Sequence, residues 1–378
     1  MKLINKSLID LENCFQTIFN LKIKDTEICL KLIDYFIAKK STRLINNIYS
    51  FLTSVPLFMD SKTIKFKNEE INYDSNSFYY INKITSGTYG DISNCIFNNN
   101  ECIVKNIKFE KTDYEDKSSM YLLNSEFLTE NIIHLILFCM YNSMILCSKH
   151  SIPNCIPQIH NIINATNNTN LDTIIVIMEK LDIDMFTFFN KRSSFVEEIS
   201  LISQVAYNLY NLQKCFNSFM HRDFHCANIM LKKMNNVQKI KIITEDVEFE
   251  VYSKYQTYII DFGMCSVDFK SKCKNIKMEK SKIYVEGSYE NHRTYNKGQD
   301  LRLFLASIYY WHNKNISSKL KSMLKEMFEP YEQIHKFKKY RNNNQPTFFF
   351  YDDVLKVQDI NFYPENFLYK IKKKYSLI

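Results

Sequence analysis

HRDFHCAN, residues 221–228, places a carboxylate at Asp223 and a side-chain amide five residues later at Asn228. A carboxylate can accept the proton of a hydroxyl nucleophile, and Mg²⁺ binds to oxygen ligands such as an amide carbonyl. The stretch therefore predicts a catalytic loop in which Asp223 is the base and Asn228 turns back to bind a metal ion. His221 is expected to hold the loop by packing and hydrogen bonding, and Arg222 places a cation beside the base.

A second carboxylate follows the octapeptide at the end of an apolar strand. The run YIIDFG, residues 258–263, places Asp261 directly after two isoleucines. An aspartate at the end of a strand can belong to an ordinary turn, but its position after the octapeptide favours a second metal ligand. His225 lies two residues after Asp223. An imidazole is therefore expected beside the reacting groups.

Only five glycines occur in the chain, and two of them lie in the run ITSGTYGDI between two predicted strands. A tight turn of this kind can bring backbone N–H groups close to phosphate oxygens, although an ordinary hairpin turn is the alternative. We expect the segment to contact a nucleotide through Gly87, Thr88, Tyr89 and Gly90, with Ile92 covering a flat base.

Lys105 is the ionisable residue of an apolar strand that begins at Cys102. An ammonium group near a phosphate turn can bind phosphates as a point charge if a carboxylate holds it in place. We expect Glu130, with Glu126 as the alternative, to supply that carboxylate from a long helix over 121–148. The apolar residues that follow Glu130 would pack this helix on the sheet, whereas a surface glutamate is the other interpretation of the position.

Hydrophobic spacing along the chain predicts both strands and helices. Helical spacing occurs within residues 1–60 and again from about residue 195 onward. Short β-branched and aromatic runs predict strands at 78–81, 91–97, 101–105 and 171–178, a turn at Asn98-Asn99-Asn100, and further strands within Lys239 to Ile260.

Composition indicates a packed globular protein, since 46% of the residues are hydrophobic and 15% are aromatic. The net charge of +8 is spread along the sequence, and only six of the 49 basic residues are arginine. Nucleic-acid binding is therefore not expected. The eleven cysteines form no CxxC pair and are expected to be reduced thiols of an intracellular protein. The apolar run Ile132–Cys147 is shorter than the roughly 20 residues of a spanning helix, so no membrane span is expected.

The sequence resembles eukaryotic-type protein kinases and is similar to divergent serine/threonine kinases of large DNA viruses. The resemblance implies an intracellular location, which for a viral protein would be the host cytoplasm or the virion. The octapeptide, the Asp-Phe-Gly run and the glycine turn carry this resemblance. It implies an α+β, two-lobed kinase-like fold within 78–378. A small antiparallel-sheet lobe would span about 78–180 and a mainly helical lobe about 181–378. Residues 1–77 would form a helical extension, and a β-rich insertion would span about 236–257.

The resemblance also implies a role for each candidate residue. Lys105 and Glu130 would form the ion pair of the small lobe. Asp223 would be the catalytic base, and Asn228 and Asp261 would bind Mg²⁺. The remaining roles concern the nucleotide and the loop: Met178 behind the adenine, Glu179 to Leu181 as the hinge, Asp184 against the ribose, and Asp300 as the anchor of the catalytic loop.

Three departures from the family pattern bear on function. Thr85 stands where the phosphate loop usually begins with glycine, and His225 stands where serine/threonine kinases usually carry lysine. No Ala-Pro-Glu closes the activation segment, for which Glu290 is the substitute. The expected function is transfer of the ATP γ-phosphate, with Mg²⁺, to a serine or threonine hydroxyl of a protein substrate. One alternative is a small-molecule kinase of the aminoglycoside or choline type, a class that the histidine at position 225 resembles. The other alternative is a nucleotide-binding pseudokinase that acts as a scaffold.

Overall fold

The chain forms two compact units in the computed structural model. The residues that the structure describes are 78–87, 90–110, 134, 137, 141, 152–166, 171–215, 217–262, 265–268, 295–332 and 359–375. Those of the first unit lie between 78 and 180, and those of the second unit are 152–156 and the described residues from 181 onward. The helices predicted within residues 1–77 lie outside the described residues.

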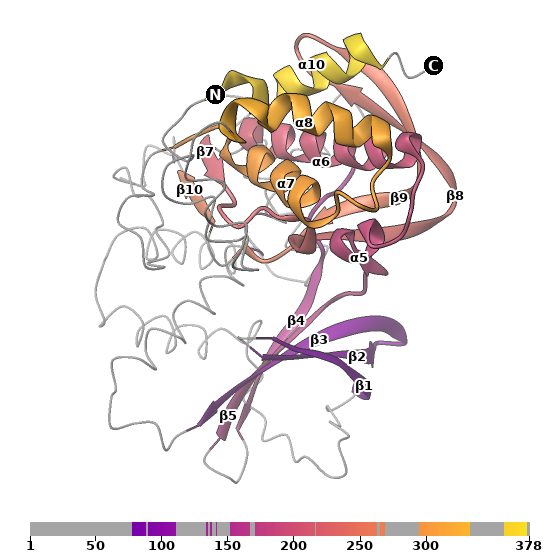
Figure 1. The fold of residues 1–378 in the computed structure, drawn as a ribbon. Helices are drawn as coiled ribbons and strands as arrows, with labels where there is room; N and C mark the ends of the chain where they lie inside the picture. The colour runs from indigo at the N-terminus through magenta and orange to yellow at the C-terminus, as the bar shows by residue number, and fades with distance from the viewer. Residues whose placement is uncertain are drawn as a thin grey trace. The chain divides into compact units, whose positions relative to one another are not determined.

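The first unit contains a five-stranded antiparallel sheet with strand order β1-β2-β3-β5-β4 (Figure 1). Its strands are β1 (Phe78–Gly87), β2 (Gly90–Phe97), β3 (Asn100–Glu110), β4 (Ile159–Thr166) and β5 (Leu171–Glu179). The predicted meander and the strand at 171–178 are confirmed, whereas β4 was not predicted. Its sequence, IHNIINAT, mixes polar and apolar residues without regular alternation.

Two asparagines make the turn between β2 and β3. Asn98 and Asn99 have positive φ values of 50° and 61°. Asparagine tolerates this left-handed backbone better than most residues, and two such residues suit a tight hairpin turn. The turn predicted at this triplet is therefore confirmed. Of the predicted long helix over 121–148, the structure describes His134, Leu137 and Tyr141, each of which is helical and buried.

The second unit combines helices with a long hairpin (Figure 1). Its helices are α5 (Met185–Phe189), α6 (Phe195–Cys215), η2 (Cys226–Asn228), α7 (Gln299–Trp311), α8 (Ser318–Glu332), η6 (Ile360–Phe362) and α10 (Pro364–Lys374). Its strands are β6 (Ile183–Asp184), β7 (Asn217–Met220), β8 (Ile229–Ile243), β9 (Glu248–Ile259) and β10 (Ser266–Asp268).

Helix α6 is the centre of the second unit. Its residues from Glu198 to Leu212 are buried on every side, which is typical of a core helix. Two of its polar side chains bind the backbone of β9, because Gln204 Nε2 donates to Tyr255 O at 3.1 Å and Asn208 Nδ2 donates to Thr257 O at 3.2 Å. These bonds fix the base of the β8–β9 hairpin on the helix.

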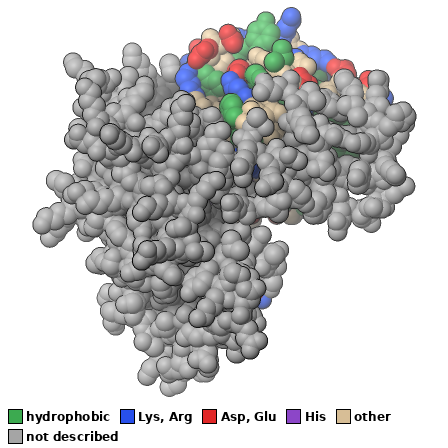
Figure 2. Space-filling view, turned by 90° about the vertical axis from the view of Figure 1, so that its left-hand side faces the viewer, with side chains coloured by type: hydrophobic (Ala, Val, Ile, Leu, Met, Phe, Trp, Pro, Cys, Tyr) green, Lys and Arg blue, Asp and Glu red, His purple; other side chains and the backbone are tan. Residues whose placement is uncertain are grey.

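The fold class is α+β, as predicted, with an antiparallel sheet in one unit and a mainly helical second unit. The hairpin begins at Ile229, ten residues before the alternation from which strands were predicted. Among the described residues, no helix combines the length and apolar composition needed to cross a membrane. On the described surface that Figure 2 shows, basic, acidic and apolar side chains are mixed.

Candidate functional site

The octapeptide forms a loop between β7 and β8 in the second unit. Asn228 Nδ2 donates to the backbone oxygen of Asp223 at 2.8 Å and to its carboxylate Oδ2 at 3.2 Å. The side chain predicted to be the base and the side chain predicted to bind the metal are thus in contact. Because the amide nitrogen faces Asp223, Oδ1 is the atom with which Asn228 could bind a cation.

Asp300, in the first turn of α7, holds the start of the loop. Its carboxylate is fully buried and accepts hydrogen bonds from the backbone N–H of His221 at 2.7 Å and of Arg222 at 2.9 Å. Burial raises the pKa of Asp300, and the two N–H bonds act in the opposite direction. Arg222 has a φ of 68°, a left-handed conformation that costs a non-glycine residue energy. The bonds to Asp300 keep the backbone in that conformation.

His221 ties the loop to the backbone that precedes Asp261. Its Nε2 donates to Ile260 O at 2.9 Å, and its ring packs against Phe262 with the centroids 5.4 Å apart. The backbone N–H of Ile260 also donates to Asn228 O at 3.1 Å. Asp261 has a φ of 64°, and its side chain is exposed. The structure therefore brings the two predicted metal-ligand positions onto neighbouring, mutually bonded backbone segments.

The donor chemistry of these residues fits Mg²⁺, because carboxylate and amide oxygens are its preferred protein ligands. No cluster of three or more His, Cys, Asp or Glu side chains suited to a metal occurs in the described part of the chain. Mg²⁺ usually binds through one or two protein oxygens together with substrate phosphates and water.

His225 lies beside the carboxylate of Asp223. The two side chains approach within 3.5 Å, from His225 Nε2 to Asp223 Oδ1. Burial alone would raise the pKa of Asp223, but the hydrogen bond and positive charge of His225, aided by His221 and Asn228, hold this pKa below its usual range. Asp223 is therefore ionised at neutral pH, as a proton acceptor must be.

Trp311, at the end of α7, is a residue of this site that the sequence did not point to. Its ring meets that of His225 edge-on at a centroid distance of 5.6 Å and that of Phe186 at 5.7 Å. Trp311 is the only tryptophan of the chain, but it lies 83 positions beyond the octapeptide. No local spacing rule connects the two, so the contact could be found only from the fold.

Cys226 anchors the second half of the loop. Its N–H donates to Ser307 Oγ at 3.0 Å, and its Sγ lies 3.7 Å from His312 Nε2. Burial raises the pKa of the Cys226 thiol to about 12 and lowers the pKa of the His312 imidazole to about 4. Both groups are therefore neutral, and the thiol is not a nucleophile. The five cysteines whose side chains the structure describes are all buried, and none of the five forms a disulfide.

The nucleotide residues predicted in the first unit are placed only by strand register. Gly87 pairs with Gly90 where β1 and β2 meet, and Thr88 and Tyr89 between them lie outside the described residues. Lys105 is central in the sheet, opposite Ile92 of β2 and Val176 of β5. Glu130 and Glu126 also lie outside the described residues, so the predicted ion pair with Lys105 stays a prediction.

The predicted adenine and ribose residues have partners of their own. Met178 pairs with Ile103 in register, and Glu179 N donates to Gln158 O at 2.8 Å. Leu181 is buried, and it follows the boundary between the two units.

Asp184 caps α5 by accepting hydrogen bonds from the backbone N–H of Thr187 at 2.7 Å and from its hydroxyl at 2.8 Å. This carboxylate has a structural role in the described fold, and its ribose contact stays a prediction.

No family model matches the chain, and no curated protein matches its sequence. Among solved structures, the chain is similar to the crystal structure of the kinase domain of PF14_0431, with 18% sequence identity and a TM-score of 0.36. The match covers 55% of this chain and 57% of that one, so the chain spans little more than half of the structure it matches. The likeness is distant. The assignment of a function therefore rests on the geometry of the loop.

Proposed function

We propose that the protein is a phosphotransferase that moves the γ-phosphate of ATP to a hydroxyl group. The observation that supports this most is the environment of Asp223. His225 holds the pKa of this carboxylate below its usual range, and Asn228 donates a hydrogen bond to it. Asp300 holds the backbone at the start of the same loop. Phosphoryl transfer needs little covalent chemistry from the protein, and positioning with charge stabilisation supplies most of the rate. A rigid loop with one oriented base suits that demand.

In the reaction, Asp223 orients the acceptor hydroxyl and accepts its proton as the oxygen attacks phosphorus. Asn228 and Asp261 offer oxygen ligands for Mg²⁺, which when bound neutralises the charge on the phosphates. His225 lies on the other side of the Asp223 carboxylate. In its protonated form it adds a cation beside the transferred group.

The first unit is proposed to bind the nucleotide. Lys105 would bind phosphates as a point charge, with Glu130 as its carboxylate partner. The turn from Gly87 to Gly90 would offer backbone N–H groups, and Ile92 and Met178 would face the base. These roles come from the sequence resemblance and are compatible with the central position of Lys105 in the sheet.

The acceptor is proposed to be a serine or threonine hydroxyl of a protein. The aromatic group beside the base favours a second candidate, a small-molecule alcohol. Phe186 is 37% exposed and contacts Trp311, which contacts His225. Exposed aromatic rings next to a base can bind a small apolar or cationic acceptor by stacking or cation–π contact.

Transfer of labelled γ-phosphate from ATP, measured on generic proteins, an aminoglycoside and choline in parallel, tests the proposal. Label on protein serine or threonine would support the first candidate, and label only on a small alcohol would support the second. Binding of ATP without transfer to any acceptor, in the presence of Mg²⁺, would contradict the proposed activity and favour a scaffold.

A further inference from the structure

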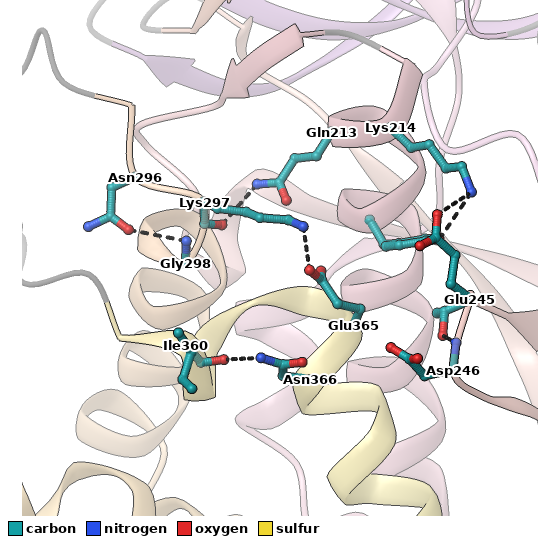
Figure 3. Close-up of polar contacts among 12 residues, drawn as sticks. Gln213, Lys214, Glu245, Asp246, Asn296, Lys297, Gly298, Ile360, Glu365 and Asn366 are labelled. Atoms are coloured by element: carbon teal, nitrogen blue, oxygen red, sulfur yellow. Dashed lines mark hydrogen bonds and ion pairs between the residues drawn. The ribbon is translucent and has the colours of Figure 1, made fainter.

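The C-terminal helix contacts the segment that leads into α7 (Figure 3). The ammonium of Lys297 forms an ion pair with Glu365, the second residue of α10. The same ammonium lies 5.5 Å from the centre of the Tyr363 ring. We define Asp359–Tyr375 as the C-terminal segment. Two of its residues, Tyr363 and Glu365, therefore contact Lys297, which directly precedes the N-cap of α7.

Gly298, the N-cap of α7, also lies against this C-terminal segment. A Cβ atom at Gly298 would be 3.0 Å from Asp359 O and 3.2 Å from Phe362 Cβ. The first distance involves backbone, which cannot move aside as a flexible side chain could. An alanine at Gly298 would require these neighbours to shift by a few tenths of an ångström, so η6 and the start of α7 are closely packed.

Further hydrogen bonds hold residues 296–298, which lead into α7. Gln213 Nε2, at the end of α6, donates to Lys297 O at 3.0 Å, and Gly298 N donates to Asn296 Oδ1 at 3.2 Å (Figure 3). Asn296 N donates to Met220 Sδ at 3.3 Å, and Met220 directly precedes the catalytic loop. The entry to α7 is thus held on several sides.

Asp300 connects this entry to the catalytic loop. It follows Gly298 by two residues, in the first turn of α7, and its carboxylate accepts the N–H groups of His221 and Arg222. A shift of that turn would lengthen both bonds. We infer that the C-terminal segment positions the catalytic loop, with Glu365, through Lys297, as the positioning residue. Its effect on activity rests on the proposed phosphotransferase function.

The Lys297–Glu365 pair is better shielded than a second ion pair on the same helix. The side chains of Lys297 and Glu365 are 32% and 18% exposed, whereas those of Lys374 and Glu326, paired at 2.6 Å, are 52% and 61% exposed. Glu365 Oε2 is buried and has no hydrogen-bond partner among the described residues. Solvent screens the outer pair strongly and the inner pair less.

The test compares Glu365→Gln with Glu326→Gln, a matched change at the exposed pair. Hydrogen–deuterium exchange of peptides covering 219–225 reports on the His221 and Arg222 amides and needs no assumption about activity. We expect Glu365→Gln to speed their exchange by about tenfold and Glu326→Gln to leave it at the wild-type rate. In the phosphate-transfer assay, Glu365→Gln should lower kcat by about fivefold with the KM for ATP within about twofold of wild type.

Two further variants cover the case in which Glu365→Gln unfolds. Gly298→Ala should push η6 away from α7 and speed hydrogen exchange of the His221 and Arg222 amides. The charge swap Lys297→Glu with Glu365→Lys should restore slow exchange in part. Wild-type exchange at 219–225 in both Glu365→Gln and Gly298→Ala, or equal acceleration by Glu326→Gln, would overturn the inference. If the wild type transfers no phosphate, the proposed function fails, while the exchange comparison still decides whether the segment positions the loop.

Discussion

The catalytic loop, residues 221–228, and the β8–β9 hairpin that follows it are held in opposite ways. Buried side chains bind the loop backbone, since Asp300 accepts two of its N–H groups and Ser307 accepts a third. The outer half of the hairpin, which we define as residues 238–253, carries exposed ion pairs on its surface, such as Lys239 with Glu250 at 2.8 Å.

This difference predicts how strongly each kind of contact responds to substitution. A left-handed residue such as Arg222 persists only where its surroundings over-determine the backbone, and the buried carboxylate of Asp300 does so. Exposed ion pairs are screened by water and salt and contribute little to stability. Substitutions in the loop and its anchors should therefore have large effects, and substitutions at the surface ion pairs of the outer hairpin should have small ones.

The largest expected effect on folding and activity together comes from Asp300→Asn. The amide has one acceptor oxygen for two N–H donors, and its own NH₂ group would have to be buried. We expect the free energy of unfolding to fall by about 3 kcal/mol and phosphate transfer to fall by about 100-fold. Urea unfolding and the labelled-phosphate assay measure the two effects. Asp246→Asn in the exposed hairpin turn is the control, and equal behaviour of the two variants would contradict the comparison.

Lys105→Met tests whether the loop acts with the first unit. Since the ammonium would contact phosphates in both the ground and transition states, we expect a loss of about tenfold in ATP affinity and a further loss in rate. Nucleotide titration and the transfer assay measure them separately. Unchanged activity would point instead to Lys108, which lies three residues further along β3, or to a different nucleotide site.

His225→Lys tests the charge beside the base. A lysine ammonium stays charged, whereas an imidazole can be neutral. If the acceptor is a protein hydroxyl, the variant should keep or raise the rate above about pH 7, by up to about threefold. A rate profile from pH 6 to 8.5 measures this. A uniform loss at every pH would rule out the electrostatic role, and activity only on a small alcohol would reassign the acceptor class.

The pH dependence of stability should also change when Asp223 is removed. Because its pKa in the folded protein is lowered from 3.8, Asp223 contributes stability that is present above that value and is lost as the pH falls through the folded pKa. The difference in unfolding free energy between wild type and Asp223→Asn should therefore shift toward Asp223→Asn as the pH falls below about 4. Urea unfolding at several pH values would show a flat difference if this carboxylate were unperturbed.

Glu250→Gln should have the smallest effect. It removes one exposed ion pair from the outer hairpin, so no resolvable change in melting temperature or phosphate transfer is expected. Differential scanning calorimetry at low and high salt measures the first. A clear loss of transfer would show that the outer hairpin supports the loop after all.

Sequence patterns predicted the parts of this structure that depend on local chemistry. The octapeptide indicated that Asp223 and Asn228 belong to one loop, where the structure shows them in contact, and the resemblance to kinases implied the anchoring by Asp300. The start of β8 was missed because its buried apolar part, Ile229 and Leu231, is short, and the exposed stretch that follows at 235–239 has no regular alternation. The contacts of Trp311 with His225 and of Glu365 with Lys297 join distant segments, and such pairs leave no local pattern in a sequence.

The most direct test of the central claim measures ATP binding and phosphate transfer side by side for the wild type and Asp223→Asn. The base acts on the incoming hydroxyl and not on the nucleotide, so the variant should bind ATP within about twofold of wild type. Its transfer rate should fall by about 10²–10⁴-fold. Wild-type turnover by Asp223→Asn would contradict the assignment of Asp223 as the base, and with it the proposed mechanism.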